Sequence, residues 1–151
     1  MKPILVILAA VALLLPGGAS AKEQPAVSAT ISASTEAVKF AIVARLSEHG
    51  FHLESDSPFQ MVFAKEMNNA GGVLAQAMIG NANCSMPKQV LSFTFAPQAD
   101  AVLVVGLEQL DKATVLCARE RINMDGKKNR EAMASFLADI KSKAEAKAKK
   151  E

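Results

Sequence analysis

The stretch from Ser34 to Phe63 constrains the fold more than any other, because it contains one helix with start and stop signals, followed by two short strands. Ser34 is a residue type that caps helix N-termini by accepting a hydrogen bond from a backbone N–H group of the first turn. Gly50 suits the left-handed position that follows a helix C-terminus. Between them, apolar residues recur at helical spacing: Val38, Phe40, Ile42, Val43 and Leu46. We therefore predict a helix that ends before Gly50 and is covered over a wide apolar arc.

After Gly50 the pattern changes to an alternation of apolar and polar residues, which is the period of a β-strand. Phe51 and Leu53 form the apolar side of the first strand, and residues 56–58 form a turn. The second strand carries apolar residues at Phe59, Met61 and Phe63. We expect a hairpin packed against the helix.

The first 21 residues have the three parts of an export signal. Lys2 supplies a positive charge, residues 4–15 are apolar, and residues 19–21 form a small-x-small cleavage site. The apolar run is shorter than the roughly 18 to 20 residues that span a bilayer. We therefore expect a signal peptide at 1–21, a single α+β domain at 22–151, no transmembrane segment after cleavage, and a periplasmic or secreted protein.

Four further strands and two further helices are predicted along the chain. The first three strands are 26–33, 89–96 and 101–107. The pattern across 111–124 is ambiguous between helix and strand, and we interpret it as a strand at 114–117. Residues 101–107 are apolar on both faces, which is typical of a central strand. Residues 73–78 favour a short helix, and the last helix begins near Asn129. Its apolar stripe consists of Met133, Phe136, Leu137, Ile140 and Ala144. We expect residues 144–151 to fray into solvent.

These elements predict an α+β fold in which two main helices pack on one face of a curved antiparallel sheet of five to six strands. The order is β-α-β-β-(α)-β-β-β-α. This layout resembles the helix-grip arrangement of some small bacterial envelope domains, including those of outer-membrane assembly lipoproteins. The resemblance lies in the order of the elements, so it implies no functional residues.

Cys84 and Cys117 are the only two cysteines, and both follow the predicted export signal. In an oxidising compartment we expect them to form a disulfide, which stabilises a chain with a loop of this length by about 3 to 4 kcal/mol. The alternative is a reactive thiol, which requires a reduced cysteine.

His52, Glu54 and Asp56 form the one cluster that suggests chemistry. On a regular strand they project from the same face, so two of them can meet a metal or a cationic ligand. The simpler interpretation is the solvent-facing side of a half-buried strand, and we predict no metal site or cofactor. His49 suits the helix C-terminus electrostatically.

A glycine-rich segment at 71–87 is the second candidate surface for a ligand or partner. It includes Gly71, Gly72, Met78 and Met86. Methionine thioethers bind Cu(I), but the chain has no tight methionine cluster. We interpret Met61 and Met133 as core residues.

Composition and motifs narrow the function. After removal of Lys2 the chain has 16 basic and 15 acidic side chains, a balance that does not favour nucleic-acid binding. The residues 119–151 are basic, with a net charge of +4, which predicts either a solvated helix face or contact with an anionic surface. Phosphate-binding, dinucleotide-binding and nucleophile-elbow motifs are absent from the sequence.

Three functional hypotheses follow. We favour a non-enzymatic binding or structural module of the envelope with a protein partner. The alternative is a carrier of a small apolar ligand, held between the long helix and the sheet beneath residues 71–80. The third is an enzyme or metal protein that uses His52, Glu54 and Asp56.

Overall fold

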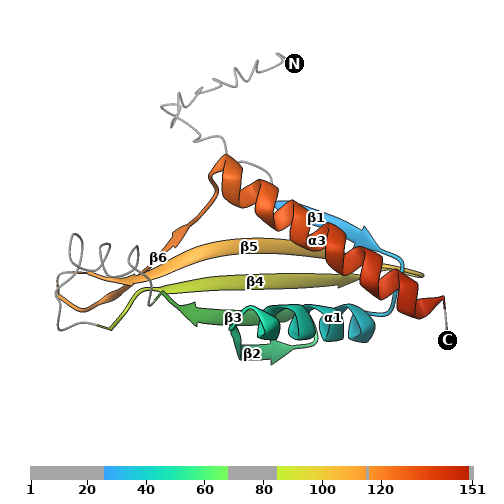
Figure 1. The fold of residues 1–151 in the computed structure, drawn as a ribbon, viewed down its shortest axis with the longest axis horizontal. Helices are drawn as coiled ribbons and strands as arrows, with labels where there is room; N and C mark the ends of the chain where they lie inside the picture. The colour runs from blue at the N-terminus through green and yellow to red at the C-terminus, as the bar shows by residue number, and fades with distance from the viewer. Residues whose placement is uncertain (1–25, 68–84, 115, 150–151) are drawn as a thin grey trace, which may run out of the picture.

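The computed structural model describes residues 26–67, 85–114 and 116–149 of the chain. It contains an open antiparallel sheet of six strands and two helices, which confirms the predicted α+β class (Figure 1). The strands are β1 (Val27–Ile31), β2 (His52–Ser57), β3 (Gln60–Glu66), β4 (Lys88–Pro97), β5 (Val102–Ala113) and β6 (Arg119–Asn123). The helices are α1 (Thr35–Glu48) and α3 (Lys127–Ala148).

Strand β5 organises the sheet, whose order is β1-β5-β4-β3-β2. One edge of β5 pairs with β4 along most of its length. The other edge is shared: β1 pairs with its first half, from Val102 to Gly106, and β6 pairs with its second half, from Gln109 to Ala113. The predicted central strand is therefore confirmed, and it continues beyond the predicted Leu107 to Ala113.

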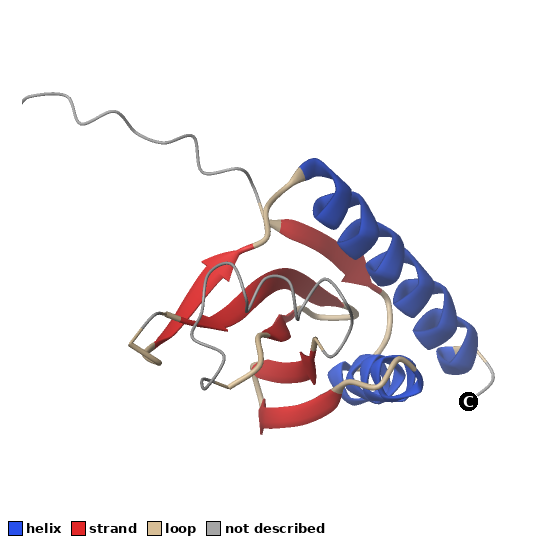
Figure 2. Ribbon diagram, turned by 60° about the vertical axis from the view of Figure 1, so that its left-hand side comes forward, coloured by secondary structure: helices blue, strands red, loops and turns tan. Residues whose placement is uncertain are grey.

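The hydrophobic core lies between the sheet and the two helices (Figures 1 and 2). The strands contribute Met61, Phe63, Phe93, Phe95 and Val104, and the helices contribute Val38, Ile42, Leu46, Met133, Leu137 and Ile140. The core positions predicted for Met61 and Met133 are thus confirmed. Burial of these side chains supplies most of the driving force that holds both helices on one face of the sheet.

Helix α3 runs along the outer edge of β1 (Figure 2). Its Lys141 Nζ donates a hydrogen bond to the carbonyl of Thr30 at 2.9 Å, and the Ser32 N–H donates to Glu145 Oε1 at 3.0 Å. Such cover protects the polar edge of a sheet from pairing with another chain. The helix continues to Ala148, so the prediction that residues 144–148 fray is wrong: alanine, lysine and glutamate favour helix, and Glu145 is held by its contact with β1.

Both ends of α1 match the sequence signals. Ser34 Oγ accepts from the Ala37 N–H at 3.2 Å. At the other end, the N–H groups of Gly50 and Phe51 donate to the carbonyls of Ser47 and Leu46, and Gly50 has a φ of 77°. This is the Schellman arrangement, in which a glycine allows the chain to reverse.

The prediction of a wide apolar arc on α1 is wrong at Phe40, which is 65% exposed. Residues two positions apart point to nearly opposite sides of a helix, so Phe40 faces away from the buried Val38 and Ile42. Lys39 is instead buried on the core side.

The hairpin is confirmed, but its alternation is interrupted in β2. Leu53 pairs with Phe63 while Ser55 pairs with Val62, so Glu54 is the extra residue of a β-bulge. A bulge shifts the faces of the residues that follow it. Leu53 precedes the bulge and is 44% exposed on this edge strand, and Phe59 lies in the turn with 63% exposure, so these two apolar residues do not pack in the core.

The last strand lies later than predicted. The chain turns after Ala113: the Cys117 N–H donates to the carbonyl of Thr114 at 2.9 Å, and Cys117 takes a left-handed φ of 60°. Leu116 is 90% exposed. The strand is Arg119–Asn123. It is exposed along its whole length and carries mostly charged side chains, so its sequence lacks the apolar–polar alternation that predicts a strand.

Candidate functional site

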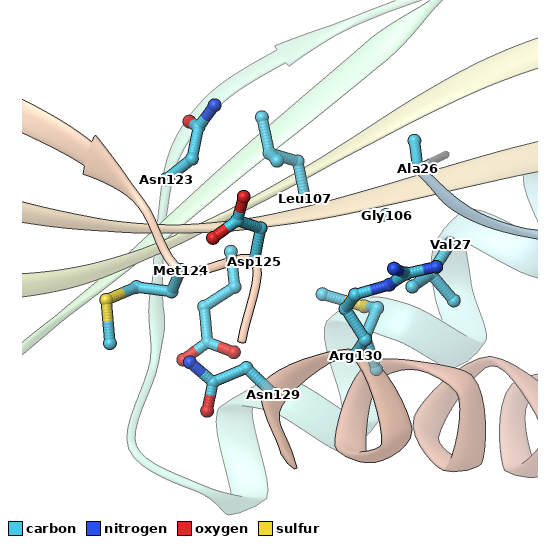
Figure 3. A pocket seen from close by; sticks show the side chains of 11 residues that line it. Ala26, Val27, Gly106, Leu107, Asn123, Met124, Asp125, Asn129 and Arg130 are labelled. Carbon is cyan, nitrogen blue, oxygen red and sulfur yellow. The ribbon is translucent and has the colours of Figure 1, made fainter. Parts of the chain in front are cut away.

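A pocket with a volume of about 460 Å³ lies between the start of α3 and the sheet (Figure 3). It is formed by β1, β5, the end of β6 and the first two turns of α3. The lining residues are Ala26, Val27, Gly106, Leu107, Glu108, Asn123, Met124, Asp125, Asn129, Arg130 and Met133.

The pocket exists because two strands share one edge of β5. The pairing with β1 ends at Gly106 and the pairing with β6 begins at Gln109, which leaves Leu107 and Glu108 between them. The Met124 N–H donates to the Glu108 carbonyl at 2.9 Å and so fixes the end of β6 at this point. The chain then turns through Asp125 and Gly126 into α3. The first turns of α3 cover the gap that β1 and β6 leave on β5, which is called the notch below.

Gly106 is required by the packing above it. A Cβ atom at this position lies 2.5 Å from Met133 Sδ, closer than non-bonded atoms approach. The missing side chain therefore lets Met133 lie directly on β5 and form one wall of the pocket.

The pocket lining combines apolar and polar side chains. Val27, Leu107, Met124 and Met133 supply the large apolar surfaces. Glu108 is held by Gln89, whose Nε2 donates to Oε1 at 2.7 Å, and Asn123 Oδ1 accepts from Gln109 Nε2 at 2.9 Å. This arrangement can bury an apolar body and offer hydrogen bonds to a polar end.

Asp125, Asn129 and Arg130 add hydrogen-bonding groups where the chain enters α3 (Figure 3). The site therefore carries both signs of charge: Glu108 and Asp125 are acidic, and Arg130 is basic. Its lining favours a ligand with a polar end over a pure hydrocarbon.

The structure separates the cluster that the sequence suggested. His52 Nε2 and Glu54 Oε1 lie 3.8 Å apart, and Lys88 Nζ lies 3.5 Å from the same Glu54 oxygen. Asp56 lies on the other face, because the bulge at Glu54 reverses the alternation, and it forms an ion pair with Lys39 of α1. The prediction that all three project from one face is therefore wrong. Within the described ranges, no three His, Cys, Asp or Glu residues are arranged to hold a metal ion.

The other candidate residues divide between the described and undescribed ranges. Met86 is half-buried just before β4. Gly71, Gly72, Met78 and Cys84 lie outside the described residues. Cys117 lies in the turn between β5 and β6, and the described ranges contain no free cysteine. Its pairing with Cys84 stays a prediction.

Sequence reasoning missed the pocket residues. One available signal was Gly106 inside an otherwise apolar strand, since a glycine there often marks a close approach of another group. No sequence pattern predicts that residues between Met124 and Met133 line the pocket, because their position depends on where β6 ends.

Comparisons with known proteins provide no family for this chain: no family model, curated protein or solved structure matches it. In the described part of the chain, neither helix has the length and apolar character needed to cross a membrane.

Proposed function

We propose that this chain is a non-enzymatic binding protein of the bacterial envelope, exported by residues 1–21, that carries a small molecule in the pocket between α3 and β5. The ligand has an apolar body and a polar end. The observation that carries the proposal is the pocket itself, which the shared edge of β5 builds into the fold.

Size and chemistry support this function. A volume of about 460 Å³ suits small-molecule sites, which typically measure about 300 to 1,000 Å³. Burying the apolar part of a ligand against Val27, Leu107 and Met133 contributes about 25 cal/mol for each Å² of apolar surface removed from water. The polar lining residues then select among molecules with similar apolar bodies.

The proposed site differs from the one expected beneath residues 71–80, which lie outside the described ranges. Its described lining comes from β1, β5, β6 and α3. The ligand class of the earlier hypothesis is retained, with a polar end added because Asn129 and Arg130 line the pocket.

Native mass spectrometry of the protein purified from its host's periplasm tests the proposal. We expect the folded chain to retain an organic molecule of low mass. Met124→Glu, which places a charge in the apolar wall, should lower the retained fraction by roughly tenfold or more. Ile122→Glu is the matched control: Ile122 is 38% exposed, against 36% for Met124, and does not line the pocket.

Two results would contradict the proposal. One is a bare protein that also fails to take up any member of a series of fatty acids and other amphiphiles added before the measurement. The other is a retained molecule that Met124→Glu and Ile122→Glu release equally, because the ligand then lies elsewhere.

A further inference from the structure

A second surface, at the opposite end of α3, is unrelated to the pocket. Here α1 and the last turns of α3 enclose a hollow of about 200 Å³. Its lining combines alanines, one aromatic ring, three basic side chains and one acidic side chain. The lining residues are Ala37, Phe40, Ala41, Ala44, Arg45, Glu48, Lys143, Ala144 and Lys147.

Phe40 is the apolar feature of this surface. It is 65% exposed, and leaving a ring of this size in water forgoes a large part of its burial energy. Three alanines, Ala37, Ala41 and Ala44, lie near the ring on α1. Lys147 Nζ lies 5.0 Å from the ring centroid, so a positive charge accompanies the exposed aromatic group.

The basic groups around Phe40 are only partly neutralised. Arg45 Nε and Lys143 Nζ share Asp139 Oδ2, at 3.3 and 3.2 Å. Arg45 also pairs with Glu48, at 3.1 Å. By contrast, no carboxylate of the described residues lies within ion-pair distance of Lys147. From Asp139 to Lys149, four lysines face two acidic residues, so the end of α3 carries a net charge of +2.

We propose that this surface, defined by Phe40, Lys143 and Lys147, docks on the anionic surface of a phospholipid bilayer. An aromatic ring inserts at the level of the headgroups, and lysines beside it pair with phosphate while their stems stay apolar. The lysines also gain from the negative potential of an anionic membrane.

A bilayer fits this surface better than an acidic protein. The hollow measures only about 200 Å³, whereas an amphipathic helix needs a groove long enough for several anchors at successive turns. A single exposed ring with lysines beside it needs no complementary shape from its partner. Such a surface needs only a partner with negatively charged groups outside and an apolar interior beneath them, as in an anionic bilayer.

Vesicle co-sedimentation tests the proposal on the protein as isolated from cells. We expect binding to vesicles that contain phosphatidylglycerol, weak binding to pure phosphatidylcholine vesicles, and loss of binding at high salt. The double variant Lys143→Gln and Lys147→Gln should weaken binding roughly tenfold, because both lysines line the hollow beside Phe40.

The same helix offers a matched control. Lys127→Gln with Lys128→Gln removes the same net charge from the other end of α3, where Lys127 is 90% exposed. This pair should leave vesicle binding within about twofold of the unaltered protein, because charges far from the contact are screened. Since all variants share the same N-terminal residues, a difference between them reports the end of α3.

A second pair tests the aromatic ring without disturbing the core. Phe40→Ala should weaken binding several-fold. Phe59→Ala, at a ring that is 63% exposed in the hairpin turn, should not. Circular dichroism of each variant shows whether its fold is intact.

Equal binding of both lysine pairs, equal binding of both phenylalanine variants, or equal binding to the two kinds of vesicle would overturn the proposal. So would sedimentation only with an acidic protein and never with anionic vesicles. Ligand retention in the α3–β5 pocket should be the same in all these variants, which separates this surface from the proposed function.

Discussion

At the scale of single residues, Lys39 is a buried charged side chain whose ammonium group is paired at the border of the hydrophobic core. Its side chain is only 10% exposed, and its Nζ donates to an Asp56 carboxylate oxygen and to the Ser57 carbonyl, the latter at 2.8 Å. The same Nζ lies 5.8 Å from the centroid of Phe95. These contacts join α1 to β2 at the edge of the sheet, and they exist because the bulge at Glu54 turns Asp56 toward the helix.

We predict that Asp56→Ala lowers the free energy of unfolding by about 1 to 2 kcal/mol, because it leaves the buried Lys39 ammonium with one carbonyl partner. Lys39→Met should cost less than about 1 kcal/mol, because the apolar stem remains packed and the half-exposed Asp56 returns to water. Urea denaturation monitored by circular dichroism measures both.

Glu54→Ala on the same strand is the control, since its contacts with His52 and Lys88 are long and partly exposed. It should change stability by less than about 0.5 kcal/mol. If Lys39→Met were the more costly of the two variants in the Lys39–Asp56 pair, the lysine charge itself would be stabilising, contrary to this account.

At the scale of elements, the two helices begin differently. α1 has a serine cap that accepts from the Ala37 N–H and a glutamate in its first turn. α3 begins after Gly126, which provides no side-chain cap, and its first turn has no acidic residue. Its position therefore depends on packing of the Met133, Leu137 and Ile140 stripe rather than on its own start signal.

Exchanging the cap types tests this difference. Gly126→Ser should raise the free energy of unfolding by about 0.5 kcal/mol, because a serine at this extended position can accept from an N–H of the first turn. Ser34→Ala should lower it by about 1 kcal/mol. Both changes are measurable by thermal or urea denaturation.

A lower free energy of unfolding in Gly126→Ser would contradict a capping role for this position. A Cβ at Gly126 meets no atom within 4 Å, so steric conflict would not explain such a result.

At the scale of the whole molecule, the sheet packs one face against both helices. Its edge strands β1 and β2 are protected from pairing with another chain in different ways. α3 covers the edge of β1, whereas β2 at the other edge is short, bulged and polar. The shared edge of β5 then leaves a notch, and the start of α3 turns that notch into a pocket. The candidate site is thus a product of strand lengths as well as of side chains.

We predict that the exported protein begins after residue 21 and contains a disulfide between Cys84 and Cys117. Mass spectrometry should find the mature chain two hydrogens lighter than its reduced form. Cys117→Ser should lower the free energy of unfolding by about 3 to 4 kcal/mol, because it releases a closed loop of the unfolded chain. A mature mass that includes two free thiols would contradict the disulfide.

The sequence alone determined the elements whose signals are local. Ser34, Gly50 and the spacing of Val38, Ile42 and Leu46 specify α1, since caps and helical periodicity depend on neighbours a few residues apart. The α+β class, the hairpin and the apolar stripe of α3 followed for the same reason. For the pocket, the one local signal was Gly106.

Only the tertiary structure decided which residues meet. The bulge at Glu54 moved Asp56 to the other face of the strand, and the length of β5 placed β1 and β6 on one edge with a notch between them. Bulges and strand ends depend on pairing with a distant partner, so no local pattern records them. For this reason the predicted cluster was separated, while Val27, Met124 and Met133, distant in sequence, came together around Gly106.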